Sequence, residues 1–181
     1  HVGYAVYQYA KLRILEFVYD FINVYLDKSD FQFMQMDTDS MYMALSQPTF
    51  EECIKPEMRE QFEQEKHKWF ATTQFDKYTP GLFKEEATGT GMCCICPKVY
   101  VLWGGKKVKS SAKGSNKDNE LTREAYLNVL ETGQAHRVVN HGMRVINDEM
   151  ISYTQNKVGF TYYYDKRIVL EDGITTIPLL I

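Results

Sequence analysis

The chain has 181 residues, of which 44% are hydrophobic and 25% are charged, and its formal net charge is −3. This balance excludes a disordered chain, and no apolar run approaches the ~20 residues of a membrane span, so we expect no membrane partner. The chain begins at His1 without an initiator Met, and we expect it to be part of a longer protein. Its four cysteines are too few for a disulfide framework at this length, which favours a reducing intracellular compartment.

The first elements expected in chain order are a long helix and a β-hairpin. Residues 4–26 contain no Gly or Pro and carry one narrow polar stripe. We therefore expect a helix that is largely buried or lies against a further domain. Apolar runs at 31–36 and 41–45 flank Asp37-Thr38-Asp39-Ser40, which predicts a β-hairpin with four polar residues at its tip.

A second helix and a group of strands are expected next. Pro56 suits the first turn of an amphipathic helix that ends near Phe70. Residues 92–96 and 98–103 predict strands, and Pro97 between them indicates an edge or a bulge. The cysteines of the first strand lack the spacing of a zinc site and are typical of small apolar strand residues.

The last third of the chain predicts a helix followed by short strands. Residues 110–119 are polar and predict a link between domains, and we place a domain boundary at 109/110. Residues 122–132 predict a helix, capped by Asn119 or Thr122 and ended by Gly133. The strands expected after it cover residues 159–164, 167–170 and 174–177. Tyr162, Tyr163 and Tyr164 would alternate between the faces of a strand, which favours one or two core positions over base stacking.

Charge is distributed unevenly along the chain. Residues 1–96 carry 9 basic and 15 acidic side chains, whereas residues 97–181 carry 12 basic and 9 acidic ones. The second half therefore favours a polyanionic partner, although ordinary solvated surface has the same composition. Five lysines follow one another with no acid among them: Lys106, Lys107, Lys109, Lys113 and Lys117. They suit contacts with phosphate, and a solvated surface loop is the alternative interpretation.

Asp37 and Asp39 are the residues with the clearest chemistry. Two carboxylates at the tip of an apolar hairpin repel each other unless a cation compensates them, and Mg²⁺ accepts carboxylate oxygens while keeping waters that a phosphate can replace. Two such ions support phosphoryl transfer. A polar turn is the alternative, because Asp, Thr and Ser all suit turns.

The run Asp37-Thr38-Asp39-Ser40 resembles the Asp-Thr-Asp-Ser motif of family B DNA polymerases, and Lys98-Val99-Tyr100 resembles their Lys-x-Tyr motif. Outside these two motifs, the sequence is most similar to the protein-primed branch of the family, including the polymerases of Polinton/Maverick elements and related viruses. That similarity rests on residues 10–17, 35–40 and 80–84, together with Lys166-Arg167 and residues 172–176.

The resemblance implies an α+β fold: residues 1–109 as the end of a palm subdomain and residues 110–181 as a small mixed thumb. It implies Asp39 as a direct Mg²⁺ ligand, Asp37 as its partner, and Thr38 and Ser40 as motif neighbours. DNA would be held by Lys98, Tyr100, Lys107, Lys109 and Lys113. The implied partners are primer-template DNA, an incoming dNTP and a terminal protein primer, at a nuclear or viral replication site.

The sequence also departs from this family. Gln35 stands where the family often has Tyr, which affects a sugar or primer contact rather than the metal. The third acid, the nucleotide-binding fingers motif and any exonuclease motif do not occur in these 181 residues, so we expect the chain alone to be inactive. Two other functions remain open: a non-enzymatic DNA-binding remnant of a mobile element, and an unrelated metal-dependent nuclease.

Overall fold

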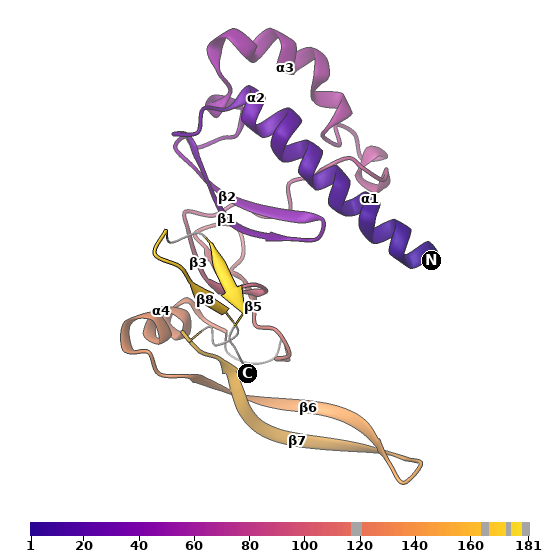
Figure 1. Cartoon of the computed structure of the whole chain (residues 1–181), viewed down its shortest axis with the longest axis vertical. Helices are drawn as coiled ribbons and strands as arrows, with labels where there is room; N and C mark the ends of the chain where they lie inside the picture. The colour runs from indigo at the N-terminus through magenta and orange to yellow at the C-terminus, as the bar shows by residue number, and fades with distance from the viewer. Residues whose placement is uncertain (117–120, 164–166, 173–174, 179–181) are drawn as a thin grey trace. The chain divides into compact units, whose positions relative to one another are not determined.

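The computed structural model describes residues 1–116, 121–163, 167–172 and 175–178. Its architecture is α+β, as predicted, and every described pair of strands is antiparallel (Figure 1). The chain divides into two compact units, His1–Ala87 (unit 1) and Thr88–Ile181 (unit 2). The palm and thumb assignment, with its boundary at 109/110, stays a prediction. In the described part of the chain, no helix is long and apolar enough to cross a membrane.

Unit 1 begins with the predicted long helix. It comprises α1 (Val2–Glu16), a π-helical segment (Phe17–Ile22) and α2 (Asn23–Tyr25), which follow one another without a break. All the apolar side chains of the π segment face the core, whereas its Tyr19 remains 65% exposed. Phe17, the first residue of this segment, packs against rings from later in the unit: Trp69, Phe70 and Phe83.

The expectation of a largely buried helix is wrong for its N-terminal half. Burial begins at Ile14, whereas Tyr4, Tyr7 and Tyr9 are 66–72% exposed. The described part of unit 1 supplies a core only for the C-terminal half, so apolar composition overstated the burial of this helix. The alternative, a further domain against α1, stays a prediction.

The predicted hairpin forms strands β1 (Phe31–Asp37) and β2 (Ser40–Leu45), with one bulge between Phe33 and Gln35. Its tip is tighter than expected, because Asp37 and Ser40 pair as the last residues of the two strands and leave a two-residue turn. The partly buried Met41, Met43 and Leu45 pack against the helical core. That core anchors the hairpin and thereby places its tip.

The remainder of unit 1 closes this core. The predicted helix after Pro56 is present in three consecutive pieces: a 3₁₀ turn (Pro56–Met58), α3 (Arg59–Glu65) and a second 3₁₀ turn (Lys66–Lys68). Two further 3₁₀ turns are Glu51–Cys53 and Asp76–Tyr78. Phe21 is fully buried and lies within about ring-contact distance of six aromatic side chains: Phe17, Tyr25, Phe50, Phe62, Trp69 and Phe70.

Unit 2 opens with a three-stranded sheet of β3 (Gly91–Cys96), β4 (Val99–Trp103) and β5 (Lys109–Ser111) in that order. The two predicted strands and the predicted bulge beside Pro97 are confirmed, since the register shifts between Cys94 and Cys96. The expected link over 110–119 is wrong at its start. Ser110 and Ser111 pair with β4, because the return after Gly104-Gly105 reaches Ser111.

Helix α4 (Arg123–Thr132) agrees with the sequence at both ends. The Thr122 hydroxyl accepts a hydrogen bond from the Ala125 backbone N–H, and Gly133 ends the helix with a φ of +69°. Tyr126 and Val129 of α4 are fully buried in a second core that includes Val101 and Phe160. Asn119, the other predicted cap, lies outside the described residues.

A long hairpin of β6 (His136–Ile146) and β7 (Glu149–Phe160) is the element that the sequence did not predict (Figure 1). The strand predicted over 159–164 is confirmed only for Gly159 and Phe160, where β7 ends, and is wrong for 161–163: Tyr162 and Tyr163 are 54% and 70% exposed beyond it. Strands β8 (Arg167–Val169) and β9 (Thr176–Pro178) form the expected last pair. Tyr164, Lys166, Gly173 and Ile174 lie outside the described residues, as does Lys117.

Candidate metal and nucleic-acid sites

The β1–β2 tip brings the two predicted acids together within unit 1. Asp37 ends β1 and is half-buried, whereas Asp39 occupies the turn and is exposed. The turn is closed by the Asp39 N–H, which donates to the Asp37 carbonyl at 2.6 Å, and by the Ser40 hydroxyl, which donates to the same carbonyl at 3.2 Å. The Thr38 hydroxyl donates to the Asp37 carboxylate at 3.2 Å. The motif neighbours therefore hold the turn and orient Asp37.

Backbone strain marks this turn. Thr38 has a φ of +48°, a left-handed conformation that β-branched residues rarely adopt. Such a residue costs on the order of 1–3 kcal/mol and tends to occur at functional sites. Lys98, in the other predicted motif, also has a positive φ, of +67°. Two more non-glycine residues of the described chain have a positive φ, Asn147 and Asp148, which form the turn between β6 and β7.

The donor set at the tip suits a hard divalent cation with few protein ligands. Carboxylate oxygens are the ligands that Mg²⁺ prefers, and an exposed Asp39 leaves room for water or phosphate. Within the described residues, no group of three or more His, Cys, Asp or Glu side chains could hold a metal ion. A Mg²⁺ ion at this tip would therefore need water or further ligands in addition to the two carboxylates.

An open groove of about 430 Å³ lies between α1 and the hairpin tip. Its lining combines exposed polar side chains with an apolar floor: Tyr7, Gln8, Lys11, Ile14, Leu15, Met36 and Thr38. Sequence reasoning missed this groove, because a helix and a hairpin that are distant in sequence form it together. Lys11 gives the groove a cation next to the turn that carries the acids.

Lys98 and Tyr100 lie at the β3–β4 hairpin of unit 2. Pro97 and Lys98 form its two-residue turn, and the Lys98 side chain is exposed. The Lys98 carbonyl accepts a hydrogen bond from the Ser111 hydroxyl at 3.0 Å, which ties this turn to β5. Tyr100 is half-buried in β4 and pairs with Cys94 and Ser111. A turn held in this way presents Lys98 at a fixed place on the sheet.

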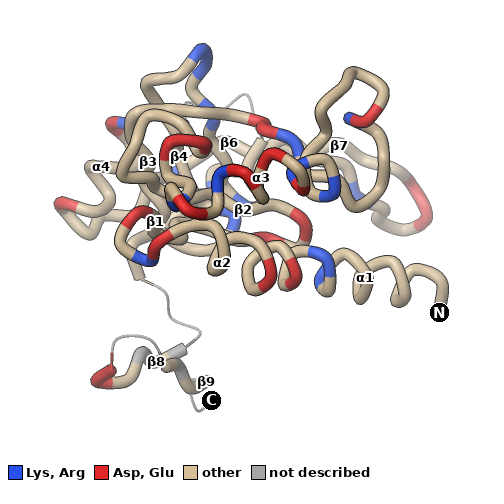
Figure 2. Tube along the Cα trace, turned by 90° about the horizontal axis from the view of Figure 1, so that it is seen from above, with Lys and Arg blue, Asp and Glu red and all other residues tan. Residues whose placement is uncertain are grey.

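The predicted phosphate-binding lysines lie mainly on the surface of unit 2. Lys107 and Lys113 are exposed, as is Lys106, whereas Lys109 is half-buried in β5. From Thr88 to Asn116 the chain has five lysines and no acid. In unit 1, by contrast, basic and acidic residues are interspersed along the helices (Figure 2). The β3–β5 region therefore has the charge pattern of a surface that binds phosphates.

The β6–β7 hairpin adds basic residues that sequence reasoning missed. Arg137 and Arg144 are exposed on β6 and Lys157 is half-buried on β7, while the acids of the hairpin, Asp148 and Glu149, lie at its tip. The guanidinium of Arg144 lies 5.1 Å from the Tyr153 ring centroid. The sequence did indicate a basic region here, because residues 132–147 and 150–163 contain no acid.

Three of the four cysteines pack in the cores, Cys53 in unit 1 and Cys93 and Cys96 in unit 2. All four are free thiols, and Cys53 and Cys93 are buried. Burial raises the pKa of Cys93. Burial, together with the neighbouring Cys93 thiol, raises the pKa of Cys94 to about 11. Thiols with raised pKa values are poor nucleophiles and poor metal ligands at neutral pH.

No protein-family model, no curated protein and no solved structure matches this chain.

Proposed function

We infer that this chain is the end of the palm and the thumb of a family B DNA polymerase, which transfers a nucleotide to a primer 3′ end. The observation that carries the proposal is the strained hairpin tip, where Asp37 and Asp39 flank Thr38, whose φ is +48°, in one tight turn. An ordinary polar turn has no need of a β-branched residue in this conformation. A fixed pair of carboxylates does gain from such a turn, because the turn limits their separation.

Mg²⁺ is the cofactor of the proposal, and Asp39 and Asp37 are the residues that would hold it. When bound, it would supply charge neutralisation for the reacting phosphates. Asp39 is the exposed carboxylate and faces solvent, while the Thr38 hydroxyl orients Asp37. The third carboxylate belongs to a part of the polymerase outside this chain, in agreement with the two-acid tip.

Primer-template DNA is the proposed macromolecular ligand of unit 2. Lys98 and Tyr100 would position the primer end, and Lys107, Lys109 and Lys113 would contact duplex phosphates without reading sequence. Arg137 and Arg144 extend the same cationic, acid-poor character to β6. The incoming dNTP and a terminal protein primer would need residues beyond this chain.

The test of the metal assignment is Asp39→Asn in the intact polymerase. We expect it to abolish primer extension while DNA binding stays nearly unchanged, because the amide keeps the shape of the side chain and removes its charge. Asp20→Asn, at an exposed acid of the same unit, is the matched control and should extend primers normally. Normal extension by Asp39→Asn at millimolar Mg²⁺ would overturn the assignment.

The isolated 181-residue chain gives a second, independent readout. We expect no nucleotide incorporation by it, because two carboxylates bind Mg²⁺ weakly and the fingers are missing. Incorporation above background, with the intact polymerase as positive control, would show that the active site has been misplaced.

A DNA-binding remnant without catalysis is the second candidate function, and the acid-free lysine stretch of unit 2 supports it equally well. The reading frame from which this chain comes would distinguish the two functions. A polymerase requires the upstream acid motif, and a remnant does not. The metal-dependent nuclease receives no such support, since it would need further acids close to the tip and the described residues contain no such group.

A further inference from the structure

The outer edge of β7 is the feature of unit 2 that the proposed function does not use. The hairpin is closed by a two-residue turn of Asn147 and Asp148, whose φ values of +50° and +65° are those of a type I′ turn. In such a hairpin the pair that closes the turn, Ile146 and Glu149, is a hydrogen-bonded pair, and the pairs then alternate. The backbone groups of every second residue of β7 therefore point away from β6: Met150, Ser152, Thr154, Asn156 and Val158.

An observed contact on β6 supports this alternation. The alternation directs the backbone of His141 away from β7, and the His141 carbonyl indeed accepts a hydrogen bond from the Asn116 side chain at 3.1 Å. The outer edge of β6 is thus covered in part by another segment of unit 2. Within the described residues, β7 pairs with no strand other than β6.

Between Glu149 and Lys157, the β7 edge lacks the devices that usually prevent strands from pairing at an edge. From Arg137↔Val158 to Ile146↔Glu149 its register with β6 contains no bulge, and the strand contains no Pro. Its residues from Met150 to Asn156 include no charged side chain. Long, regular and uncharged edges are templates for the addition of another strand.

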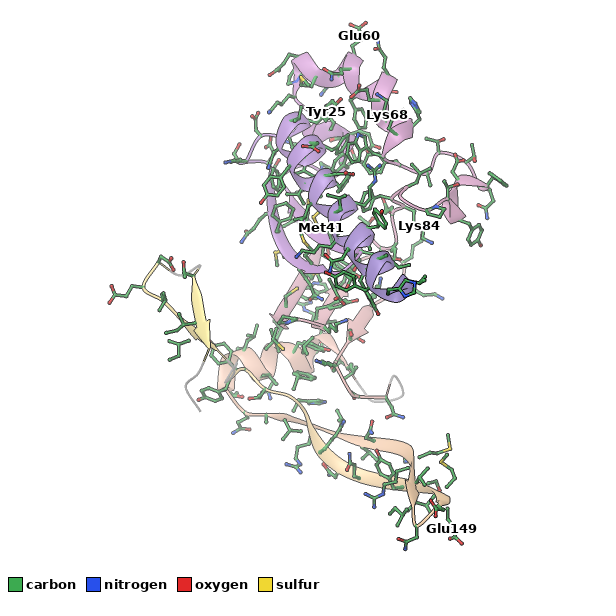
Figure 3. The ribbon with its side chains drawn as sticks, turned by 45° about the vertical axis from the view of Figure 1, so that its right-hand side comes forward. Tyr25, Met41, Glu60, Lys68, Lys84 and Glu149 are labelled. Carbon is green, nitrogen blue, oxygen red and sulfur yellow. The ribbon has the colours of Figure 1, made fainter. Side chains whose placement is uncertain are left out.

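We propose that β7 pairs antiparallel with β7 of a second copy of this chain, centred on Tyr153, so that two hairpins form one four-stranded sheet. The argument for a second copy is that the edge is complementary to itself. Glu149 and Lys157 lie equally far from Tyr153 on opposite sides, so antiparallel pairing about Tyr153 places each Glu149 directly opposite Lys157 of the partner subunit. The Lys157 ammonium also donates a hydrogen bond to the Gly114 carbonyl of its own chain, and its remaining N–H groups can donate to the carboxylate. Glu149 is exposed close to the hairpin tip (Figure 3).

The hydrogen-bond pattern and the side chains agree with the same centre. Pairing about Tyr153 places Met150 opposite the partner's Asn156 and Ser152 opposite the partner's Thr154, and these are the residues whose backbone groups point outward. Met150 and Val158, which are 67% and 47% exposed, become diagonal neighbours across the new strand pair. A centre between two residues would place inward-bonded groups opposite the outward groups of the partner, and a shift of the centre by one whole residue would separate Glu149 from Lys157.

The test is sedimentation velocity of the 181-residue chain, without nucleic acid, over a series of micromolar concentrations. We expect a reversible monomer–dimer equilibrium in the unaltered chain. Glu149→Lys should weaken dimerisation by about tenfold or more, because a like-charged pair replaces a complementary pair twice in each dimer. Glu149→Lys combined with Lys157→Glu restores complementary charges and should restore the dimer. Glu131→Lys, an exposed acid of α4, is the matched control and should leave the equilibrium unchanged.

A backbone variant tests the edge itself. Ser152→Pro removes an outward N–H and leaves the bonds to β6 in place, so we expect loss of the dimer with the hairpin retained, as measured by the cross-strand nuclear Overhauser effect between His141 and Thr154. A chain that is monomeric at every concentration would overturn the proposal. A dimer that tolerates both Glu149→Lys and Ser152→Pro would also overturn it, because its interface would lie elsewhere.

Discussion

The two units differ in the size and composition of their cores. Unit 1 owes its core to rings packed around one continuous helix, with Phe21 fully buried among six aromatic neighbours. Unit 2 has a small core at α4, and its longest element, the β6–β7 hairpin, contributes Val138 and Phe160 to that core and exposes most of its other side chains. Unit 1 is therefore stabilised mainly by apolar burial, and much of unit 2 by backbone pairing.

Charge follows the same division. Unit 1 carries 9 basic and 15 acidic residues, a balance of −6, and unit 2 carries 12 and 9, a balance of +3. The acids proposed to hold metal lie in unit 1 and the cations proposed to hold DNA lie in unit 2. The contrast teaches that burial and charge give separate information along this chain: burial identifies the core residues, and charge identifies the residues proposed to bind ligands.

The largest expected effect is the loss of the aromatic core of unit 1. Phe21→Ala should destabilise the unit by about 3–5 kcal/mol, because it leaves a cavity among rings that cannot close over it. Amide hydrogen exchange should show the loss of protection in residues 1–87. Tyr19→Ala, at a 65% exposed ring of the same π segment, is the control and should cost less than about 1 kcal/mol. Equal effects of the two variants would contradict the assigned core.

Two buried tyrosines, one in each unit, allow the stabilities of the units to be compared as pH changes. The Tyr25 hydroxyl donates to the Glu65 carboxylate at 2.7 Å, and the Tyr126 hydroxyl donates to the Ser111 carbonyl at 2.6 Å. Burial, together with Glu65, raises the pKa of Tyr25 to about 12, and the hydrogen bond from Tyr25 lowers the pKa of Glu65 below its usual 4.5. Burial also raises the pKa of Tyr126.

The Tyr25→Phe variant should therefore be pH-dependent in acid and the Tyr126→Phe variant should not. Because the folded pKa of Glu65 is lowered, its contribution is present above the unfolded value and is lost as pH falls through the folded pKa. The destabilisation by Tyr25→Phe should shrink over that range, whereas Tyr126→Phe should cost about 1 kcal/mol throughout. Urea unfolding at neutral and acid pH measures both, and a pH-independent Tyr25→Phe would contradict the Glu65 linkage.

The smallest expected effect concerns the strained turn. Thr38→Gly should raise the stability of unit 1 by about 0.5 kcal/mol, because relief of the left-handed backbone outweighs the entropy of glycine. Asn147→Gly at the corresponding turn position of β6–β7 should change stability by less, since Asn tolerates this conformation. Thermal unfolding of both variants decides the point. Thr38→Ala removes the same hydroxyl and keeps the strained backbone, so a Thr38→Gly no more stable than Thr38→Ala would mean that the turn is not strained.

Much of unit 1 was predictable, since its elements rest on local signals. Two apolar runs around Asp37-Thr38-Asp39-Ser40 predicted the hairpin, and the absence of Gly and Pro predicted the long helix. The π segment was not predictable, because its apolar sequence is equally compatible with an α-helix and its rings pack against distant segments. The exposure of Tyr4, Tyr7 and Tyr9 was missed for a related reason, as composition does not specify which half of a helix has partners.

The β6–β7 hairpin shows why the sequence of unit 2 was harder to interpret. A strand half-buried in a core alternates apolar and polar residues, but most of this hairpin has water on both faces, so Arg137-Val138-Val139-Asn140 carries no such alternation. The turn at Asn147-Asp148 was the available signal, because both residues favour positive φ. At the candidate sites, the local motifs were predictable from sequence, whereas the groove beside Thr38 depends on tertiary structure.

The salt dependence of DNA binding tests the proposed DNA-binding role of unit 2 most directly. If about four lysines of the 181-residue chain contact phosphate, a plot of log K against log salt on duplex DNA should have a slope of about −3.6. Replacing Lys107, Lys109 and Lys113 by Ala should flatten the slope by up to about 2.7 units without a change in sequence preference. Tyr100→Ala, which removes no charge, should leave the slope almost unchanged. A triple variant with the slope of the unaltered chain would contradict the account, because these lysines would then be solvated surface and nothing more.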